Sequence, residues 1–144
     1  MLLGTKRAKG WRASFGVRGA ADGRMQDACN DAFYRAIKPY PPYGAAVLYD
    51  LTGEPRCQWD TKRQLMNVSH RAWYATIKQT GAATISGYLR SPALQEPIIS
   101  FATPVYDVDG VMKGAISLGI RLNWLSAIGQ EPGLPAAAEV TLLD

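Results

Sequence analysis

Two alternating segments near the C-terminal end constrain the fold of this 144-residue chain more than any other feature. Residues 97–106 and 111–120 alternate larger and smaller side chains with a period of two, and the Asp107-Val108-Asp109-Gly110 segment between them has the composition of a turn. Successive residues of a β-strand point to opposite faces of the sheet. The pattern therefore predicts an antiparallel hairpin with two different faces.

One face of this predicted hairpin is bulky and the other is small. The bulky set comprises Ile99, Phe101, Thr103, Val105, Ile116, Leu118 and Ile120. The small set comprises Ser100, Ala102, Pro104, Ala115, Ser117 and Gly119, with the larger Ile98 on the same face at the start of the first strand. A two-residue loop would place Ser100 opposite Ser117 and make the small faces coincide, whereas a three-residue loop would break that match. Two interpretations stay open: a shallow ligand pocket with two hydroxyls, or a helix packed closely on the sheet.

The rest of the chain predicts an α+β arrangement. Apolar residues at helical spacing predict a helix over 25–38, which the proline-rich segment 39–42 ends. Ser69 is a candidate cap for a second helix, and Gly81 is a candidate for its end. The other predicted elements are strands 44–49, 55–59, 83–89 and 140–143 and helices 70–79 and 122–128. Because the connections are short and strands do not alternate regularly with helices, we expect an antiparallel sheet with helices packed on it.

The charge of the chain is concentrated at its N-terminal end. The net charge is +4; residues 1–24 hold six basic residues and one acidic residue, a net +5, and the other 120 residues hold ten and eleven, a net −1. Nucleic-acid-binding domains usually carry their basic residues on the folded body. We therefore expect no nucleic-acid partner and keep that function only as a third hypothesis. No stretch approaches the roughly 18 apolar residues of a membrane-spanning helix, which is compatible with an extramembrane piece of a membrane protein.

The residue patterns that support catalysis or metal binding are missing. Cys29 and Cys57 are the only cysteines and have no metal-ligand spacing, and His70 is the only histidine. There is also no serine–histidine–aspartate arrangement. We therefore expect no enzymatic activity, no cofactor and no metal. The residues alone leave open whether the two cysteines form a bridge or stay as buried free thiols.

A series of short motifs follows in order over residues 67–125. They are Arg71 with Trp73-Tyr74, Thr80-Gly81, Ile85-Ser86-Gly87-Tyr88, the segment 101–107, Asp109-Gly110, Gly114 and Ile120-Arg121-Leu122. In this order and spacing they resemble the Cache (PAS-like, PDC) sensor domains of bacterial transmembrane receptors, in particular the membrane-distal module of double-Cache sensors.

The resemblance implies a fold and a location. The fold is a five-stranded antiparallel sheet of PAS type, with a long N-terminal helix on one face and a short helix and loops over a ligand pocket on the other. The location is extracytoplasmic (periplasmic), with a disulfide between Cys29 and Cys57. The chain would divide into a basic N-terminal arm or helix start over 1–24, the sensor domain over 25–130, and a C-terminal strand or following module over 131–144.

The resemblance also implies ligand-binding residues. In the amino-acid-binding branch of the family, the Arg-x-Trp-Tyr segment and the downstream tyrosine hold the ligand carboxylate, while two aspartates hold its ammonium. Arg90 and Gly119 stand at those aspartate positions here, so a buried ammonium would have no counter-charge. The expected ligand is therefore a small organic acid or other anion rather than an α-amino acid. The expected binding set is Arg71, Trp73, Tyr74, Tyr88, Arg90, Ser100, Ser117 and Gly119.

Together these expectations describe the ligand-sensing domain of a membrane-anchored signalling protein, such as a histidine kinase, a diguanylate cyclase or a chemoreceptor. The membrane segments and any enzymatic output would lie outside this chain, and the full-length receptor would be a homodimer. The alternative is a non-sensory PAS-like dimerisation scaffold. A nucleic-acid-binding protein that uses the basic arm is the less favoured third hypothesis.

Overall fold

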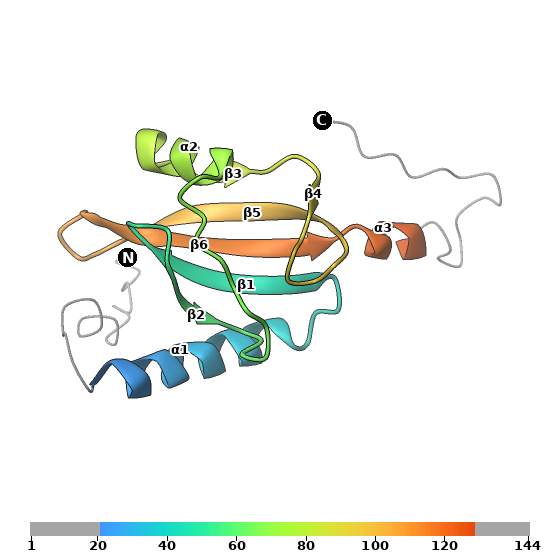
Figure 1. The fold of residues 1–144 in the computed structure, drawn as a ribbon, viewed down its shortest axis with the longest axis horizontal. Coiled ribbons are helices and arrows are strands. Elements are labelled where there is room, and N and C mark those ends of the chain that lie inside the picture. Colours follow the sequence, from blue (N-terminus) through green and yellow to red (C-terminus); the bar gives the residue numbers. More distant parts are fainter. Residues whose placement is uncertain (1–20, 129–144) are drawn as a thin grey trace, which may run out of the picture.

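The computed structural model of this chain describes residues 21–128. Its elements, in chain order, are α1 (Ala21–Ile37), β1 (Tyr43–Asp50), β2 (Pro55–Gln58), α2 (Ala72–Thr80), β3 (Thr84–Ile85), β4 (Leu89–Arg90), β5 (Pro97–Tyr106), β6 (Met112–Arg121) and α3 (Asn123–Ile128) (Figure 1). Within this part of the chain, no helix combines the length and the apolar character that crossing a membrane requires. Most of the predicted basic arm over 1–24 and all of the predicted module over 131–144 lie outside the described residues.

The strands form one antiparallel sheet in the spatial order β2-β1-β6-β5-β3 (Figure 1). The short strand β4 pairs with β5 as well, because Leu89 lies opposite Ile98 while Thr84 of β3 lies opposite Ala102. Because β3 and β4 both pair with the same edge of β5, the six strands fill five positions across the sheet. The predicted α+β class and antiparallel sheet are confirmed, and the strand count differs because one predicted edge strand is split.

Ser86 explains why the predicted strand over 83–89 is interrupted. The Ser86 amide donates to the carbonyl of Ser100, but the Ser100 amide donates to the Ser86 hydroxyl at 2.8 Å instead of to a backbone carbonyl. The Ser86 hydroxyl thus takes the place of a backbone carbonyl as acceptor of one hydrogen bond between the strands. The chain leaves the sheet at Gly87 and pairs again from Leu89.

Helix α2 begins two residues later than predicted. The side-chain oxygen of Asn67 accepts a hydrogen bond from the Ser69 amide at 2.7 Å, which holds Ser69 in a turn before the helix. Arg71, with extended backbone angles, takes the N-terminal cap position instead. The predicted end is confirmed, because Gly81 adopts the left-handed conformation, with φ at 63°, that closes a helix.

The hairpin of β5 and β6 has an unexpected register but the expected faces. Ser100 lies opposite Gly119 and not opposite Ser117. The loop over residues 107–111 pairs Tyr106 with Met112, which shifts the register by one residue, and a β-bulge between Val105 and Tyr106 adds a second residue to the shift. The shift is two residues, and an even shift leaves every side chain on its own face. The two small faces therefore coincide despite the longer loop.

Helix α2 forms the main core with part of this small face. Its buried side chains Tyr74 and Ile77 pack over Ala102 and Ala115 of the strands. The same cluster contains Val47, Tyr49 and Val68, with Leu65, Trp73 and Met112 packed against it. Small strand residues allow a helix to approach the sheet closely and to fill the space above it.

Helix α1 lies on the opposite face, against β1 and β2. Cys57 of β2 pairs with Leu48 of β1, whereas Val47 and Tyr49 belong to the core under α2. Adjacent strand residues point to opposite faces. Cys29 of α1 forms a disulfide with Cys57, with Cα atoms 5.9 Å apart. The structure thus contains the bridge that the residues alone left open.

Candidate ligand pocket

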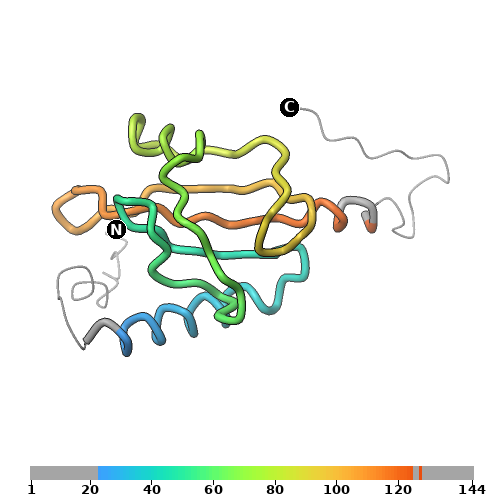
Figure 2. The backbone as a smooth tube through the Cα atoms, in the orientation of Figure 1, coloured from blue at the N-terminus to red at the C-terminus, as the bar shows by residue number. Residues whose placement is uncertain are grey.

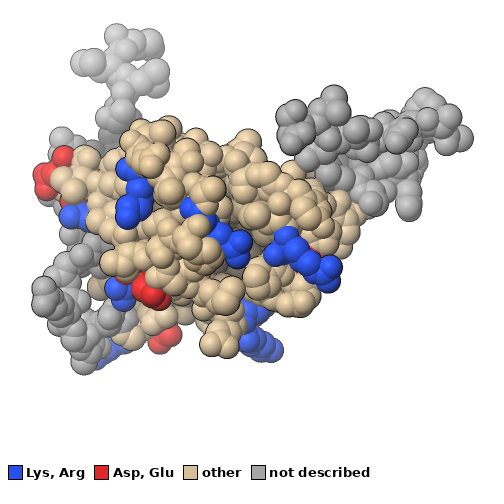
Figure 3. Space-filling view, turned by 45° about the horizontal axis from the view of Figure 1, so that its top comes forward, with Lys and Arg blue, Asp and Glu red and all other residues tan. Residues whose placement is uncertain are grey.

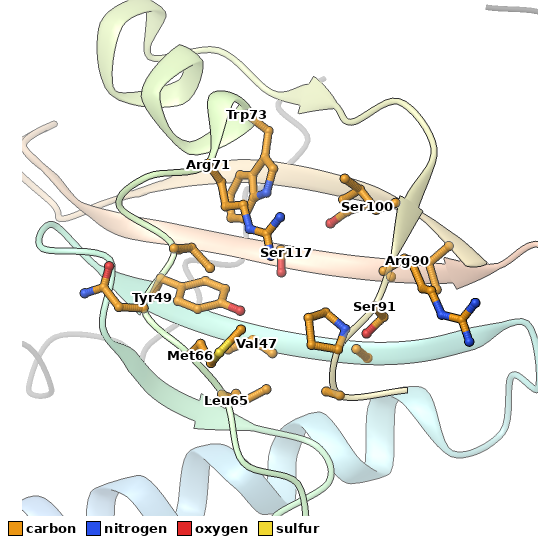
Figure 4. Close-up of a pocket in the computed structure, with 18 of the residues that line it drawn as sticks. Val47, Tyr49, Leu65, Met66, Arg71, Trp73, Arg90, Ser91, Ser100 and Ser117 are labelled. Atoms are coloured by element: carbon orange, nitrogen blue, oxygen red, sulfur yellow. The ribbon is translucent and has the colours of Figure 1, made fainter. Parts of the chain in front are cut away.

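A pocket of about 110 Å³ opens on the small face of the sheet, beside the core under α2 (Figure 4). Strands β1, β5 and β6 form its floor. Its roof consists of two segments: the loop residues 64–68, and residues 89–93, which are β4 and the start of the loop after it. Figure 2 shows that the chain from β2 to α2 and the chain around β4 both cross this face. The pocket therefore uses the part of the face that α2 leaves uncovered.

The small face thus has two halves. The filled half consists of Ala102 and Ala115, which pack under α2. The hollow half consists of Ser100, Ser117 and Gly119, which line the pocket. The same two strands carry both halves, and both interpretations left open by the sequence hold, each for one half.

Arg71 supplies positive charge to the pocket. Figure 4 shows its guanidinium reaching into the pocket above Ser117, with the Trp73 ring beside it. Four other arginines form ion pairs with carboxylates, namely Arg35, Arg56, Arg63 and Arg121. Among residues 21–128, no carboxylate forms such a pair with Arg71. A guanidinium without a partner in a partly enclosed site favours an anion, because its planar donors match both oxygens of a carboxylate.

Tyr49 is a pocket residue that the sequence did not reveal. Its side chain is 6% exposed and packs edge-on against Trp73, with ring centroids 6.0 Å apart. Burial raises the pKa of the Tyr49 hydroxyl to about 12, although the hydrogen bond with Ser117 and the charge of Arg71 act in the opposite direction. The hydroxyl therefore stays protonated at neutral pH and offers a neutral hydrogen-bonding group.

Six of the eight predicted binding residues line the pocket: Arg71, Trp73, Arg90, Ser100, Ser117 and Gly119. Tyr74 does not, because it is 1% exposed within the core and its hydroxyl donates to the carbonyl of Asp50. Tyr88 does not either, because the break at Gly87 leaves its side chain 69% exposed. The expectation that these two tyrosines face the pocket is corrected, and ligand contact by the other six stays a prediction.

Arg90 lines the pocket, but its charge points elsewhere. In Figure 4 its guanidinium is directed away from Arg71. One of its nitrogens donates to the carbonyl of Gln95 at 3.4 Å. Of these two arginines, Arg71 is thus the one whose guanidinium can meet a ligand inside the pocket.

The remaining pocket residues come from β1 and the roof. They are Ala45, Val47, Gln64, Leu65, Met66, Asn67, Val68, Leu89, Ser91, Pro92 and Ala93, and Ile98 of β5 completes the lining. Strand β1 is a mainly apolar run in the sequence, so no alternation marks which of its residues face the pocket. Loop residues have no periodic signal that could have found them.

Arg63 joins the two segments of the roof. Its guanidinium pairs with Asp60, with Nε 2.6 Å from Oδ2, and also donates to the carbonyl of Ala93. Arg63 directly precedes the first roof segment, and Ala93 belongs to the second. The Arg63–Ala93 hydrogen bond and the pairing of β4 with β5, rather than a packed helix, therefore hold the roof over the hollow half.

No acidic residue and no histidine of the described part lines the pocket. Asp60, close to the roof in sequence, pairs with Arg63, and Glu96 pairs with Arg121. Within residues 21–128 there is also no cluster of histidine, cysteine, aspartate or glutamate that could hold a metal ion. The pocket thus offers hydrogen-bond donors and apolar surface, but no anionic group for a cation and no carboxylate or imidazole base.

The fold is similar to that of solved ligand-binding receptor domains. An extracellular ligand-binding receptor from Desulfohalobium retbaense matches with a TM-score of 0.63 and 16% identity, over 76% of this chain and 22% of the receptor chain. The ligand-binding domain of the Campylobacter jejuni chemoreceptor Tlp3, solved with L-valine, matches with a TM-score of 0.63 and 14% identity, over 77% of this chain and 47% of that one. The ligand-binding domain of the Pseudomonas aeruginosa amino acid chemoreceptor PctC, solved with GABA, matches with a TM-score of 0.54 and 13% identity, over 75% and 57%.

These likenesses concern the fold, since the sequences are far apart. No family model matches the sequence, and no curated protein matches it either. The chain covers from about a fifth to little more than half of the three solved chains. The shared architecture is that of the ligand-binding domains of these receptors, which agrees with the Cache-type fold that the sequence resembles.

Proposed function

We propose that this chain is the ligand-sensing, extracytoplasmic domain of a membrane-anchored signalling protein and that its pocket binds a small carboxylate or similar anion. The observation that carries the proposal is the guanidinium of Arg71, which reaches into a pocket whose described lining holds no acid. The neutral hydroxyls of Tyr49 and Ser117 beside it are further hydrogen-bonding groups for a carboxylate.

The ligands of the structural neighbours sharpen the choice of anion. Tlp3 was solved with L-valine and PctC with GABA, and both of these ligands carry an ammonium as well as a carboxylate. An ammonium buried in the present pocket would find no carboxylate among the described residues, which costs several kcal/mol in an enclosed site. An organic acid without an amino group is the better match.

The disulfide supports an extracytoplasmic location. Bridges such as Cys29–Cys57 persist in oxidising compartments and are rare in the cytosol. The three solved neighbours are extracellular or ligand-binding domains of receptors. The membrane segments and the output module, whether kinase, cyclase or chemoreceptor, would belong to parts of the protein outside this chain.

We propose binding, not catalysis, as the role of the pocket. A general base or nucleophile needs a carboxylate, an imidazole or an activated hydroxyl within reach of the substrate. The hydroxyls of Ser100 and Ser117 have no such base beside them in the described lining. A ligand would instead shift the population between two arrangements of the domain, most directly within a homodimer of the full receptor.

A thermal-shift and calorimetric screen of the oxidised chain tests the proposal. The panel contains acetate, propionate, L-lactate, succinate, L-valine and GABA. An acid without an amino group should raise the melting temperature progressively, with about 2.7 kcal/mol of added stability at a hundred times its dissociation constant. Arg71→Gln should abolish this shift. Arg35→Gln removes the same charge on α1, far from the pocket lining, and should retain it.

Other outcomes separate the alternatives. If only the two amino acids stabilise the chain, the anion assignment is wrong while ligand sensing stands. If no member of the panel binds, the dimerisation scaffold is favoured. A nucleic-acid role has less support in the described part, because the basic side chains on the face in Figure 3 are scattered and form no continuous patch; binding that weakens steeply with salt would restore it.

A further inference from the structure

We propose that the ligand is a short monocarboxylate with an uncharged oxygen on the carbon next to the carboxylate, that is, a 2-hydroxy or 2-oxo acid of about six non-hydrogen atoms. This inference rests on the proposed ligand-sensing function and names the ligand class of the same pocket. It follows from the size of the pocket, its charge, and the spacing of its polar groups.

The size of the pocket sets the first limit. Its volume is about 110 Å³, and an engineered protein cavity of about 150 Å³ accommodates benzene, a molecule of six carbon atoms. A three-carbon acid with one extra oxygen, such as lactate or pyruvate, has the same number of non-hydrogen atoms. Longer acids would exceed this volume.

The charge of the pocket sets the second limit. The guanidinium of Arg71 enters the pocket, whereas that of Arg90 turns away from it. One ligand carboxylate is therefore matched and a second would lack a partner. The other polar groups near Arg71, the hydroxyls of Tyr49 and Ser117, are neutral. The ligand is thus a monoanion without an ammonium.

The two serines of the floor set the third limit. Ser100 lies opposite Gly119, two positions along β6 from Ser117, so the two serines are diagonal neighbours about 7–8 Å apart. Ser100 is 6% exposed. Its backbone is fully hydrogen-bonded to Ser86: its carbonyl accepts from the Ser86 amide, and its amide donates to the Ser86 hydroxyl. The Ser100 hydroxyl takes part in no hydrogen bond among the described residues and lines the pocket.

A 2-oxygenated acid spans this gap. Its carboxylate and its neighbouring oxygen are about 2.7 Å apart, and a hydrogen bond of about 2.7 Å at each end extends the reach to about 8 Å. The carboxylate would lie between Arg71 and Ser117, and the second oxygen at Ser100. The carbon body would pass beside Gly119, where an added Cβ would lie 3.3 Å from Ile98 Cδ1 and 3.5 Å from Ala45 Cβ.

Four three-carbon probes that differ only at the second carbon test the inference on the unmodified chain: propionate, L-lactate, pyruvate and L-alanine. L-lactamide, which lacks the negative charge, is the fifth probe. Calorimetry should show lactate or pyruvate binding about fivefold more tightly than propionate, because one neutral hydrogen bond is added. L-alanine and L-lactamide should bind at least about tenfold more weakly than lactate, because each leaves a charge unpaired.

Two variants locate the ligand. Ser100→Ala should bring lactate affinity down to that of propionate and leave propionate affinity unchanged, and Ser69→Ala outside the pocket is the matched control. Gly119→Ala should weaken binding of all the acids by at least about tenfold, because its methyl group crowds Ile98 and Ala45 and narrows the pocket beside the carbon body. Melting temperatures of the free variants show whether they are folded, and the probe series on the unmodified chain does not depend on them.

The outcomes separate this inference from the proposed function. If L-alanine, succinate or 2-hydroxy-4-methylpentanoate binds as tightly as lactate, or if propionate equals lactate, the inference is overturned and the sensor function stands. If no carboxylate of any kind binds, both fall together.

Discussion

The filled half and the hollow half of the small sheet face lie on the same two strands and consist of residues of similar size. Above Ala102 and Ala115, helix α2 inserts Tyr74 and Ile77 and leaves no space. Above Ser100, Ser117 and Gly119, two hydrogen-bonded loops span the sheet and leave a pocket.

This difference shows that small strand residues determine how closely something can approach the sheet, but not what approaches. A helix presents a continuous row of side chains that interdigitate with the strands. Loops held by hydrogen bonds place fewer side chains downward, so the space below them can admit a ligand. Arg71, at the start of α2, stands at the border of the two halves.

The largest expected effect is on the stability of the filled half. Ile77→Ala should lower the free energy of unfolding by about 2–5 kcal/mol, because it opens a cavity at a fully buried position. Urea denaturation measures this change, with Val111→Ala at an exposed site as the control, expected within about 0.5 kcal/mol. Affinity for L-lactate should stay within about threefold, since the hollow half is untouched. A loss of affinity as large as the loss of stability would show that the halves are not separate.

Tyr49, which belongs both to the core and to the pocket, should make the protein sensitive to alkaline pH. Its hydroxyl ionises near pH 10 in the unfolded chain and near pH 12 in the folded one. The unfolded state therefore gains stability between these values, and the folded protein should lose about 2–3 kcal/mol from this group as the pH rises through them. Urea midpoints at pH 9 and pH 11.5 should differ less for Tyr49→Phe than for the unmodified chain.

The control for this pH effect is Tyr88→Phe, because Tyr88 is 69% exposed. Its alkaline loss of stability should match that of the unmodified chain. Equal losses for all three proteins would contradict a buried, protonated Tyr49.

A matched pair of substitutions on β6 compares the halves directly. Ala115→Val adds volume where α2 already fills the space and should cost about 1–3 kcal/mol of stability. Ser117→Thr, two residues along the same strand, adds a methyl group to the pocket, keeps the hydroxyl that bonds Tyr49, and should change stability by less than about 1 kcal/mol. It should reduce carboxylate affinity at least about tenfold, whereas Ala115→Val should retain the affinity. Thermal denaturation with and without propionate measures both the stability and the binding of each variant. Equal stability losses at both sites would show that the filled half and the hollow half do not differ in packing.

The smallest effect is expected from Arg90→Gln. Its guanidinium points away from Arg71 and donates to the Gln95 carbonyl, so carboxylate affinity should fall by less than about threefold. Arg71→Gln removes the same charge from inside the pocket, and its carboxylate affinity should fall to the detection limit. Calorimetric titration of both variants would refute this assignment if Arg90→Gln were the more damaging change.

The alternation of β5 and β6 predicted the small face even though the loop length was wrong, because a β-bulge between Val105 and Tyr106 offsets the one-residue shift of the loop and restores the parity of the register. Gly81 likewise predicted where α2 ends. Tyr74 and Tyr88 were placed by analogy, and their directions depend on two local events without a periodic signal. One is the turn that delays the start of α2, and the other is the Ser86 hydroxyl that interrupts the edge strand.

The pocket itself was only half predictable. Ser100, Ser117 and Gly119 follow from strand alternation, and Arg71 from the resemblance. Tyr49 lies in a run of apolar residues, where both faces look alike, and its side-chain direction follows from the pairing of β1 with β6. The roof depends on contacts such as that between Arg63 and Ala93, which are far apart in sequence and which no local pattern indicates.

The central claim is that the hollow half, under Arg71, receives a carboxylate. A crystal structure of the oxidised chain grown with L-lactate tests it most directly. The account predicts density for the acid over Gly119, with its carboxylate within hydrogen-bonding distance of the Arg71 guanidinium. A pocket closed by the protein's own side chains, or Arg71 paired with one of the protein's own carboxylates, would contradict it.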